Sequence, residues 1–128
     1  WFNIITADEL HKDWFVAAVP TTHTRPLEGK CFGYHLNIHG NNIIYTGDTA
    51  TLEPFKPLLT KGSFLYTEAS YYKSDVHLHL KDILPELVQL TESGVHVYLM
   101  HLDVEEEIIK MIEGTKLKLV ELYENPEV

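Results

Sequence analysis

Hydrophobic and polar positions alternate most regularly in the second quarter of the chain. From residue 32 to residue 38 every second side chain is apolar, and the residues between are small or polar. This period of two predicts a half-buried strand. Residues 39–42 predict a hairpin turn, because Gly and Asn tolerate positive φ. Residues 43–45 are expected to return as a buried strand, and apolar runs at 2–6 and 14–19 predict two strands ahead of the hairpin.

The second half of the chain alternates short apolar runs with helical patterns. The runs at 63–67, 95–100 and 117–122 predict strands. Apolar residues spaced three and four apart predict a helix that ends near Ser93. Asp103 and Glu106 resemble a capping box that begins a last helix. Thr51 is expected to cap a further short helix, which two prolines make irregular.

This order of elements predicts an α+β fold. Strands that include a hairpin come first and strand–helix units follow, which favours one mixed sheet with its helices on one face. A chain of 128 residues, 45% of them apolar, can bury a sizeable core. No repeat or linker divides the sequence, so residues 1–128 are expected to form a single domain. Because Trp1 lies at the edge of a predicted strand, we expect a partial chain.

Composition narrows the classes of function. A formal net charge of −9 disfavours non-specific binding to nucleic acid, since phosphates are neutralised by Lys and Arg. The lone Cys31 excludes an internal disulfide and fits a reducing, cytoplasmic compartment. No apolar run approaches the length that crosses a bilayer, and no signal peptide is visible, so no membrane partner is expected.

Ionisable side chains recur where predicted strands end. Asp48 follows Gly47 after one strand, Glu68 and His101 end two others, and His77 precedes a helix. Side chains at such ends gather at one rim of a sheet. Imidazole nitrogens and carboxylate oxygens are zinc ligands, and a bound ion lowers the pKa of water to about 7. Taken alone, Asp48 is better explained as a residue that caps a turn with its side chain, but the ordered set favours a metal site.

Three segments carry a resemblance to a known family. Residues 45–49 (Tyr-Thr-Gly-Asp-Thr), 66–70 (Tyr-Thr-Glu-Ala-Ser) and 98–102 (Tyr-Leu-Met-His-Leu) resemble, in order and spacing, the carboxyl half of a metallo-β-lactamase-fold hydrolase. The ribonuclease Z-like branch is closest. The resemblance implies that the domain is half of an αββα sandwich. It also implies that Asp48 bridges two metal ions and that His101 ligates one of them.

The same resemblance implies roles for other ionisable residues. His77, just ahead of a helix, matches a histidine that transfers protons and contacts substrate, and His79 is close enough in sequence to compete for that role. Glu68 matches a glutamate that orients a histidine without ligating the metal. His23 lies where these proteins often carry a histidine before the hairpin, and it is assigned to the substrate side.

One motif of the family is missing. The sequence His-x-His-x-Asp-His does not occur, and residues 77–79 do not substitute for it because no Asp-His follows them. The complete protein is expected to hold two ions of zinc or of another divalent metal. Two protein ligands fall short of the three plus water that catalytic zinc usually has. We therefore expect this chain alone to bind metal poorly or not at all.

Two functions from different classes follow. The first is a fragment of a metal-dependent hydrolase, in which metal-activated water attacks an ester or phosphodiester, inactive until an amino half supplies the other ligands. The alternative is a non-catalytic half-fold that serves as an assembly or interaction module. A half-sandwich would leave one apolar sheet face uncovered, which favours pairing with the missing amino half or with another copy of the chain.

Overall fold

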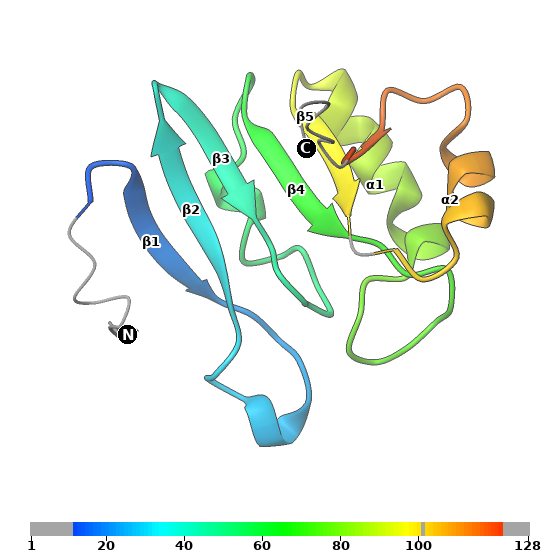
Figure 1. Ribbon diagram of the computed structural model, residues 1–128, viewed down its shortest axis with the longest axis horizontal. Coiled ribbons are helices and arrows are strands. Elements are labelled where there is room, and N and C mark those ends of the chain that lie inside the picture. Colours follow the sequence, from blue (N-terminus) through cyan, green and yellow to red (C-terminus); the bar gives the residue numbers. More distant parts are fainter. Residues whose placement is uncertain (1–11, 101, 122–128) are drawn as a thin grey trace, which may run out of the picture.

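The structure is a computed structural model that describes residues 12–100 and 102–121. In this part of the chain, strands that neighbour each other in sequence also neighbour each other in one six-stranded sheet (Figure 1). The strands are β1 (Phe15–Pro20), β2 (Phe32–Ile38), β3 (Asn41–Tyr45), β4 (Phe64–Glu68), β5 (His96–Met100) and β6 (Lys118–Leu119). The pairs β1–β2 and β2–β3 are antiparallel, whereas β3 to β6 run parallel. The expected strand at 2–6 lies outside the described residues.

Two α-helices cover one face of this sheet. They are α1 (Leu80–Glu92) and α2 (Glu105–Ile112), and two 3₁₀ turns, η2 (Arg25–Leu27) and η3 (Lys56–Leu58), lie between strands. Buried helix side chains join buried side chains of β3, β4 and β5 in one core, which includes Leu80, Leu87, Ile108, Ile112, Ile44, Leu65, Val97 and Leu99. The expected α+β fold, a mixed sheet with helices on one face, is confirmed. None of the described helices is both long and apolar enough to cross a membrane.

The segment between β3 and β4 packs a buried side chain, Phe55, against the β2–β3 hairpin. The short helix expected after Thr51, which two prolines were expected to make irregular, forms as the 3₁₀ turn η3, with Pro57 inside its single turn. Proline supplies no N–H for a helical hydrogen bond, which explains why the helix does not extend. The fully buried Phe55 lies against Gly33 of β2. A Cβ at Gly33 would stand 2.5 Å from the Phe55 ring and 2.6 Å from the carbonyl oxygen of Tyr45, so the approach requires glycine.

The other face of the sheet carries aromatic side chains. Because neighbouring strand residues point to opposite faces, the residues beside the core positions form a registered line across four strands. We call this line the tyrosine row: Tyr34, Tyr45, Tyr66 and Tyr98. The rings of Tyr66 and Tyr98 stack with centroids 5.1 Å apart, and Tyr34 and Tyr45 are 39% and 37% exposed. Both described helices lie on the opposite face.

Two predicted details near the end of the chain are wrong. The capping box of Asp103 and Glu106 does not form: α2 begins after Val104, and no side chain caps it. The Asp103 carboxylate is instead occupied by the loop before α1, since it accepts hydrogen bonds from the Ser70 hydroxyl (2.9 Å) and the Tyr71 N–H (2.7 Å). The strand predicted at 117–122 is reduced, within its described residues, to the two residues of β6.

Candidate metal centre

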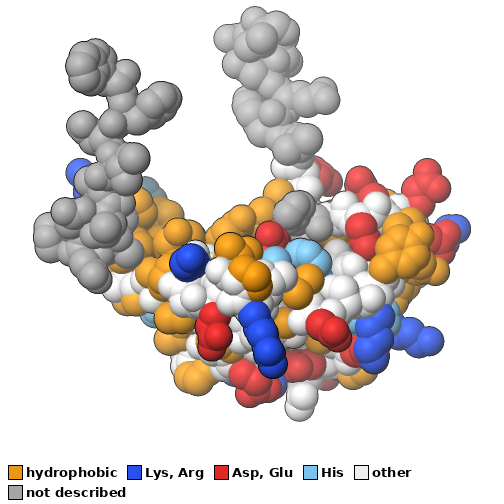
Figure 2. Space-filling model, turned by 90° about the horizontal axis from the view of Figure 1, so that it is seen from below, with side chains coloured by type: hydrophobic (Ala, Val, Ile, Leu, Met, Phe, Trp, Pro, Cys, Tyr) orange, Lys and Arg blue, Asp and Glu red, His pale blue; other side chains and the backbone are white. Residues whose placement is uncertain are grey.

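Because β3, β4, β5 and β6 run parallel, their carboxyl ends lie along the same end of the sheet. Viewed from that edge, histidine side chains lie in a hollow of the surface beside acidic side chains (Figure 2). A cavity of about 390 Å³ opens here, and Asp48, Glu68, His77 and Asp103 are among its lining residues. Gly47, with φ of +61°, turns the backbone directly after β3, which brings Asp48 to this edge.

Three of the predicted site residues converge at this cavity. One ligand atom from each of Asp48, Glu68 and His77 lies within 4.8 Å of the other two. Glu68 is only 4% exposed, whereas Asp48 and His77 are half-buried. Two carboxylates and one imidazole match the oxygen and nitrogen donors that zinc accepts. These three side chains are therefore close enough to share one metal ion.

Glu68 fixes the position of His77. One carboxylate oxygen of Glu68 lies 2.7 Å from Nδ1 of His77. The other oxygen accepts the backbone N–H of Thr49 at 2.8 Å and that of Leu78 at 3.4 Å. This buried carboxylate thus joins the turn after β3 to the segment before α1. Because Glu68 occupies Nδ1 of His77, Nε2 is the nitrogen left for a ligand or a proton.

His23 lies beside this cluster. Its ring centroid is 5.4 Å from that of His77, and the two rings are nearly perpendicular. Nδ1 of His23 accepts the backbone N–H of Thr24 at 2.9 Å, so a neutral His23 carries its proton on Nε2. The Thr21 hydroxyl donates to the backbone carbonyl of Asp48 at 3.2 Å, which ties the loop after β1 to the turn after β3.

The remaining predicted site residues lie elsewhere. His79 directly precedes α1, and its Nδ1 lies 2.9 Å from an Asp82 carboxylate oxygen in the first turn of that helix. This hydrogen bond is the main reason why the pKa of Asp82 is lowered. His79 is not one of the three clustered residues. His101, predicted as a metal ligand, lies outside the described residues.

Asp103 also lines this cavity, although the sequence pattern predicted that it caps a helix. Its carboxylate holds the loop after β4 in place, accepting the N–H groups of Tyr71 and Tyr72 and the Ser70 hydroxyl. Burial opposes ionisation of Asp103, but these hydrogen bonds and the N–H of Val104 outweigh it and lower the pKa. No spacing in the sequence signals a contact between residues 32 positions apart.

Replacing Asp103 with Ala should destabilise the fold by about 1 kcal/mol at pH 7, the range of a few exposed hydrogen bonds to a charged group. The native pKa lies below the ordinary value of 3.8, so this stabilisation is full above that value and is lost as pH falls through the native pKa. Urea unfolding at pH 7 and pH 3 measures the difference. Asp75→Ala, an exposed aspartate of the same loop, is the control. An Asp103→Ala effect that does not shrink on acidification would contradict this account.

Comparison with models of known protein families and with curated proteins found no match for this chain.

Proposed function

We propose that this chain carries part of the centre of a metal-dependent hydrolase acting on an ester or phosphodiester. The observation that carries the proposal is the convergence of Asp48 and Glu68, near the carboxyl ends of β3 and β4, with His77 from the segment before α1. The sequence resemblance to the carboxyl half of metallo-β-lactamase-fold hydrolases supports it. The two acids would repel an anionic phosphodiester, so binding such a substrate here calls for a cation that neutralises them.

Asp48, together with His101 as the resemblance implies, would hold zinc or another divalent ion, and a segment outside this chain would supply the remaining ligands. A bound ion of this kind lowers the pKa of water to about 7, so that hydroxide is present at neutral pH. Glu68 serves as a positioning residue, because both of its oxygens are taken by backbone N–H groups and by His77.

His77 is proposed to move a proton. When its imidazole is protonated, the Glu68 carboxylate on Nδ1 stabilises the charge and holds the ring. Nε2 can then donate its proton to the oxygen that leaves as the ester C–O or P–O bond breaks. His23, with its ring against that of His77, lies on the side assigned to substrate.

The test uses the longest natural polypeptide that contains this chain. Its metal content is measured together with hydrolysis of p-nitrophenyl acetate and bis(p-nitrophenyl) phosphate, before and after treatment with a chelator. We expect bound divalent metal, loss of hydrolysis on chelation and recovery when zinc is returned. A longer polypeptide that binds no metal would end this proposal.

A second candidate function is assembly, and the tyrosine row favours it. The row lies on the sheet face opposite the helices, where Phe32 and Ile38 of β2, which alternate in step with Tyr34, are also exposed. Exposed aromatic and apolar side chains in one area mark interaction sites, and tyrosine is enriched where proteins bind each other. We propose a second copy of the chain as the partner for this face.

Under this second proposal, Tyr45→Lys should weaken self-association by at least about tenfold, because it places an unpaired charge in an apolar contact. Sedimentation equilibrium over a range of concentrations measures the effect. Tyr72→Lys is the matched control, since Tyr72 is 64% exposed and lies outside the row. A wild-type chain that stays monomeric at all concentrations would rule out assembly through this face.

A further inference from the structure

The peptide group between Asp48 and Thr49 is held at both of its ends. Its carbonyl oxygen accepts a hydrogen bond from the Thr21 hydroxyl at 3.2 Å, and its N–H donates to the Glu68 carboxylate at 2.8 Å. Because a peptide group is planar, bonds at its two opposite ends fix the orientation of the plane. This plane is attached to the Cα of Asp48. The two bonds therefore constrain the direction in which this candidate metal ligand projects.

Thr21 is itself held firmly in the sheet. It is 7% exposed, it follows directly on β1, and its N–H donates to the carbonyl of Cys31 at 3.0 Å. A threonine side chain is branched at Cβ, which restricts its rotamers. The hydroxyl that bonds to Asp48 thus comes from the buried, hydrogen-bonded end of a strand.

Two further contacts join the same parts of the molecule. The carbonyl of Thr22 accepts the N–H of Ala50 at 2.8 Å. One residue further on, the ring of His23 contacts that of His77, whose Nδ1 lies 2.7 Å from a Glu68 oxygen. The contacts therefore form a closed ring, from the loop after β1 to the turn after β3, on to the glutamate, and back through the two histidines. Of the two bonds between the loop and the turn, only the Thr21 hydroxyl bond depends on a side chain.

A purely structural role for Thr21 is the alternative. Its hydroxyl would then only satisfy a carbonyl group, and its loss would lower the stability of the fold without changing the affinity for an ion. The place of the bond favours a role in the site. The carbonyl belongs to the candidate ligand Asp48 and lies on the same peptide group that Glu68 holds. Loss of a group that orients a ligand typically weakens metal binding.

We propose that Thr21 is a positioning residue of the candidate metal centre, which holds the Asp48–Thr49 peptide opposite Glu68 and so directs the Asp48 carboxylate before an ion binds. The consequence for metal affinity rests on the proposed function, whereas the consequence for the turn does not. A ligand that already has its final direction needs no rearrangement when the ion arrives, which is how supporting contacts raise affinity.

Thr21→Val tests the proposal in the longest natural polypeptide that contains this chain. Valine keeps the branched shape and removes the hydroxyl. Relative to the amides of β4 and β5, we expect amide hydrogen exchange at Thr49 and Ala50 to accelerate about fivefold, the effect of one ordinary hydrogen bond. The dissociation constant for zinc should rise about tenfold. Thr21→Ser, which keeps the hydroxyl, should restore both values.

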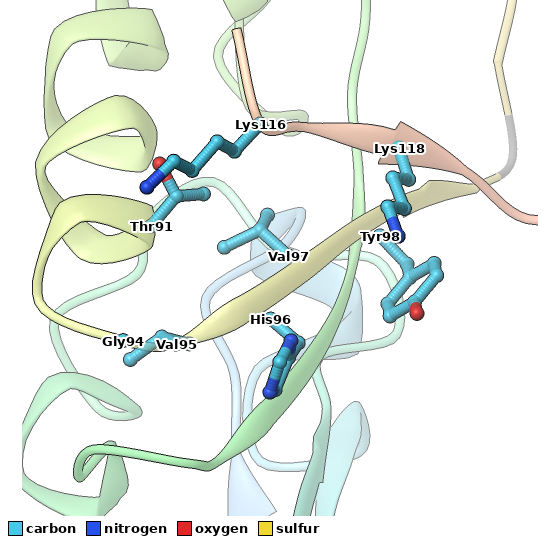
Figure 3. A pocket seen from close by; sticks show the side chains of 8 residues that line it. All are labelled: Thr91, Gly94, Val95, His96, Val97, Tyr98, Lys116 and Lys118. Carbon is cyan, nitrogen blue, oxygen red and sulfur yellow. The ribbon is translucent and has the colours of Figure 1, made fainter.

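Thr91→Val is the matched control. Thr91 is also 7% exposed, and its hydroxyl also donates to a main-chain carbonyl, that of Val88 at 2.6 Å. It lies on α1 beside the start of β5, at the end of the sheet opposite the candidate metal centre (Figure 3). The control should lower the stability of the fold in a similar way. It should leave zinc affinity and the relative exchange at Thr49 and Ala50 unchanged.

Three results would each overturn the proposal: equal effects of Thr21→Val and Thr91→Val on zinc affinity, exchange at Thr49 and Ala50 that only follows the amides of β4 and β5, or no recovery in Thr21→Ser. A wild-type polypeptide that binds no zinc would instead end the proposed function. The exchange measurement would then decide by itself whether Thr21 holds the turn.

Discussion

Asp48→Asn should remove metal and hydrolysis together from the longest natural polypeptide that contains this chain. Asparagine keeps the size of the side chain and can occupy the turn after Gly47, but it loses the negative charge that a divalent ion requires. The Thr21 hydroxyl bonds to the backbone carbonyl of residue 48, which the substitution preserves. We expect kcat/KM to fall by more than the roughly 10–100-fold that loss of a residue orienting a ligand costs.

Two further variants serve as references for the size of this effect. Glu68→Gln removes the carboxylate that holds His77, so its effect should stay within about 10–100-fold. Asp75→Asn, on the exposed loop before His77, should leave metal content and kcat/KM unchanged. Metal analysis and steady-state kinetics on the same preparations provide the measurement. An Asp48→Asn protein that keeps its metal and its activity would show that Asp48 is not a ligand.

Phe55→Ala should lower the free energy of unfolding by about 3–5 kcal/mol, the usual range for loss of a buried aromatic side chain. Phe55 is fully buried, and its ring lies against Gly33 of β2, which has no side chain. Gly33 has no side chain that could fill the space, so the substitution is expected to leave a cavity. The segment around η3 makes only a single 3₁₀ turn of its own and depends on this contact for its position.

Urea unfolding of both proteins measures this difference, with the slope on denaturant checked for constancy. Phe32→Ala is the matched control, because Phe32 is 41% exposed and its loss should cost no more than about 1 kcal/mol. Equal losses in the two variants would contradict the view that Phe55 closes the core. Repeating the measurement with a chelator present separates the effect from metal binding.

The sheet and its helices could be predicted because their signals are local. The period of two in residues 32–38 identified β2, and apolar spacing identified α1. Two details near the end of the chain depend on contacts distant in sequence, and the pattern did not show them. The Asp103 carboxylate accepts hydrogen bonds from the Ser70–Tyr72 loop and does not form the predicted capping box with Glu106, and β6 keeps only two residues.

Part of the candidate site could likewise be predicted from the sequence, and part of it could not. Asp48 and Glu68 could be predicted to converge, because parallel neighbouring strands end at one edge of a sheet. The choice between His77 and His79 could not be made from spacing, since the two histidines are separated by a single residue. In the structure, Asp82 in the first turn of α1 engages His79, whereas the buried Glu68 carboxylate engages His77.

The strictly sequential order of strands in the sheet bears on how the protein forms during translation. The chain leaves the ribosome amino end first, so each described strand emerges after the strand with which it pairs. None of the six strands within residues 12–100 and 102–121 has to wait for a later one or insert between two that have already paired. Assembly can therefore advance as a growing ribbon from β1 toward β6, and the acids and the imidazole of the candidate metal centre meet only when the residues before α1 have been synthesised.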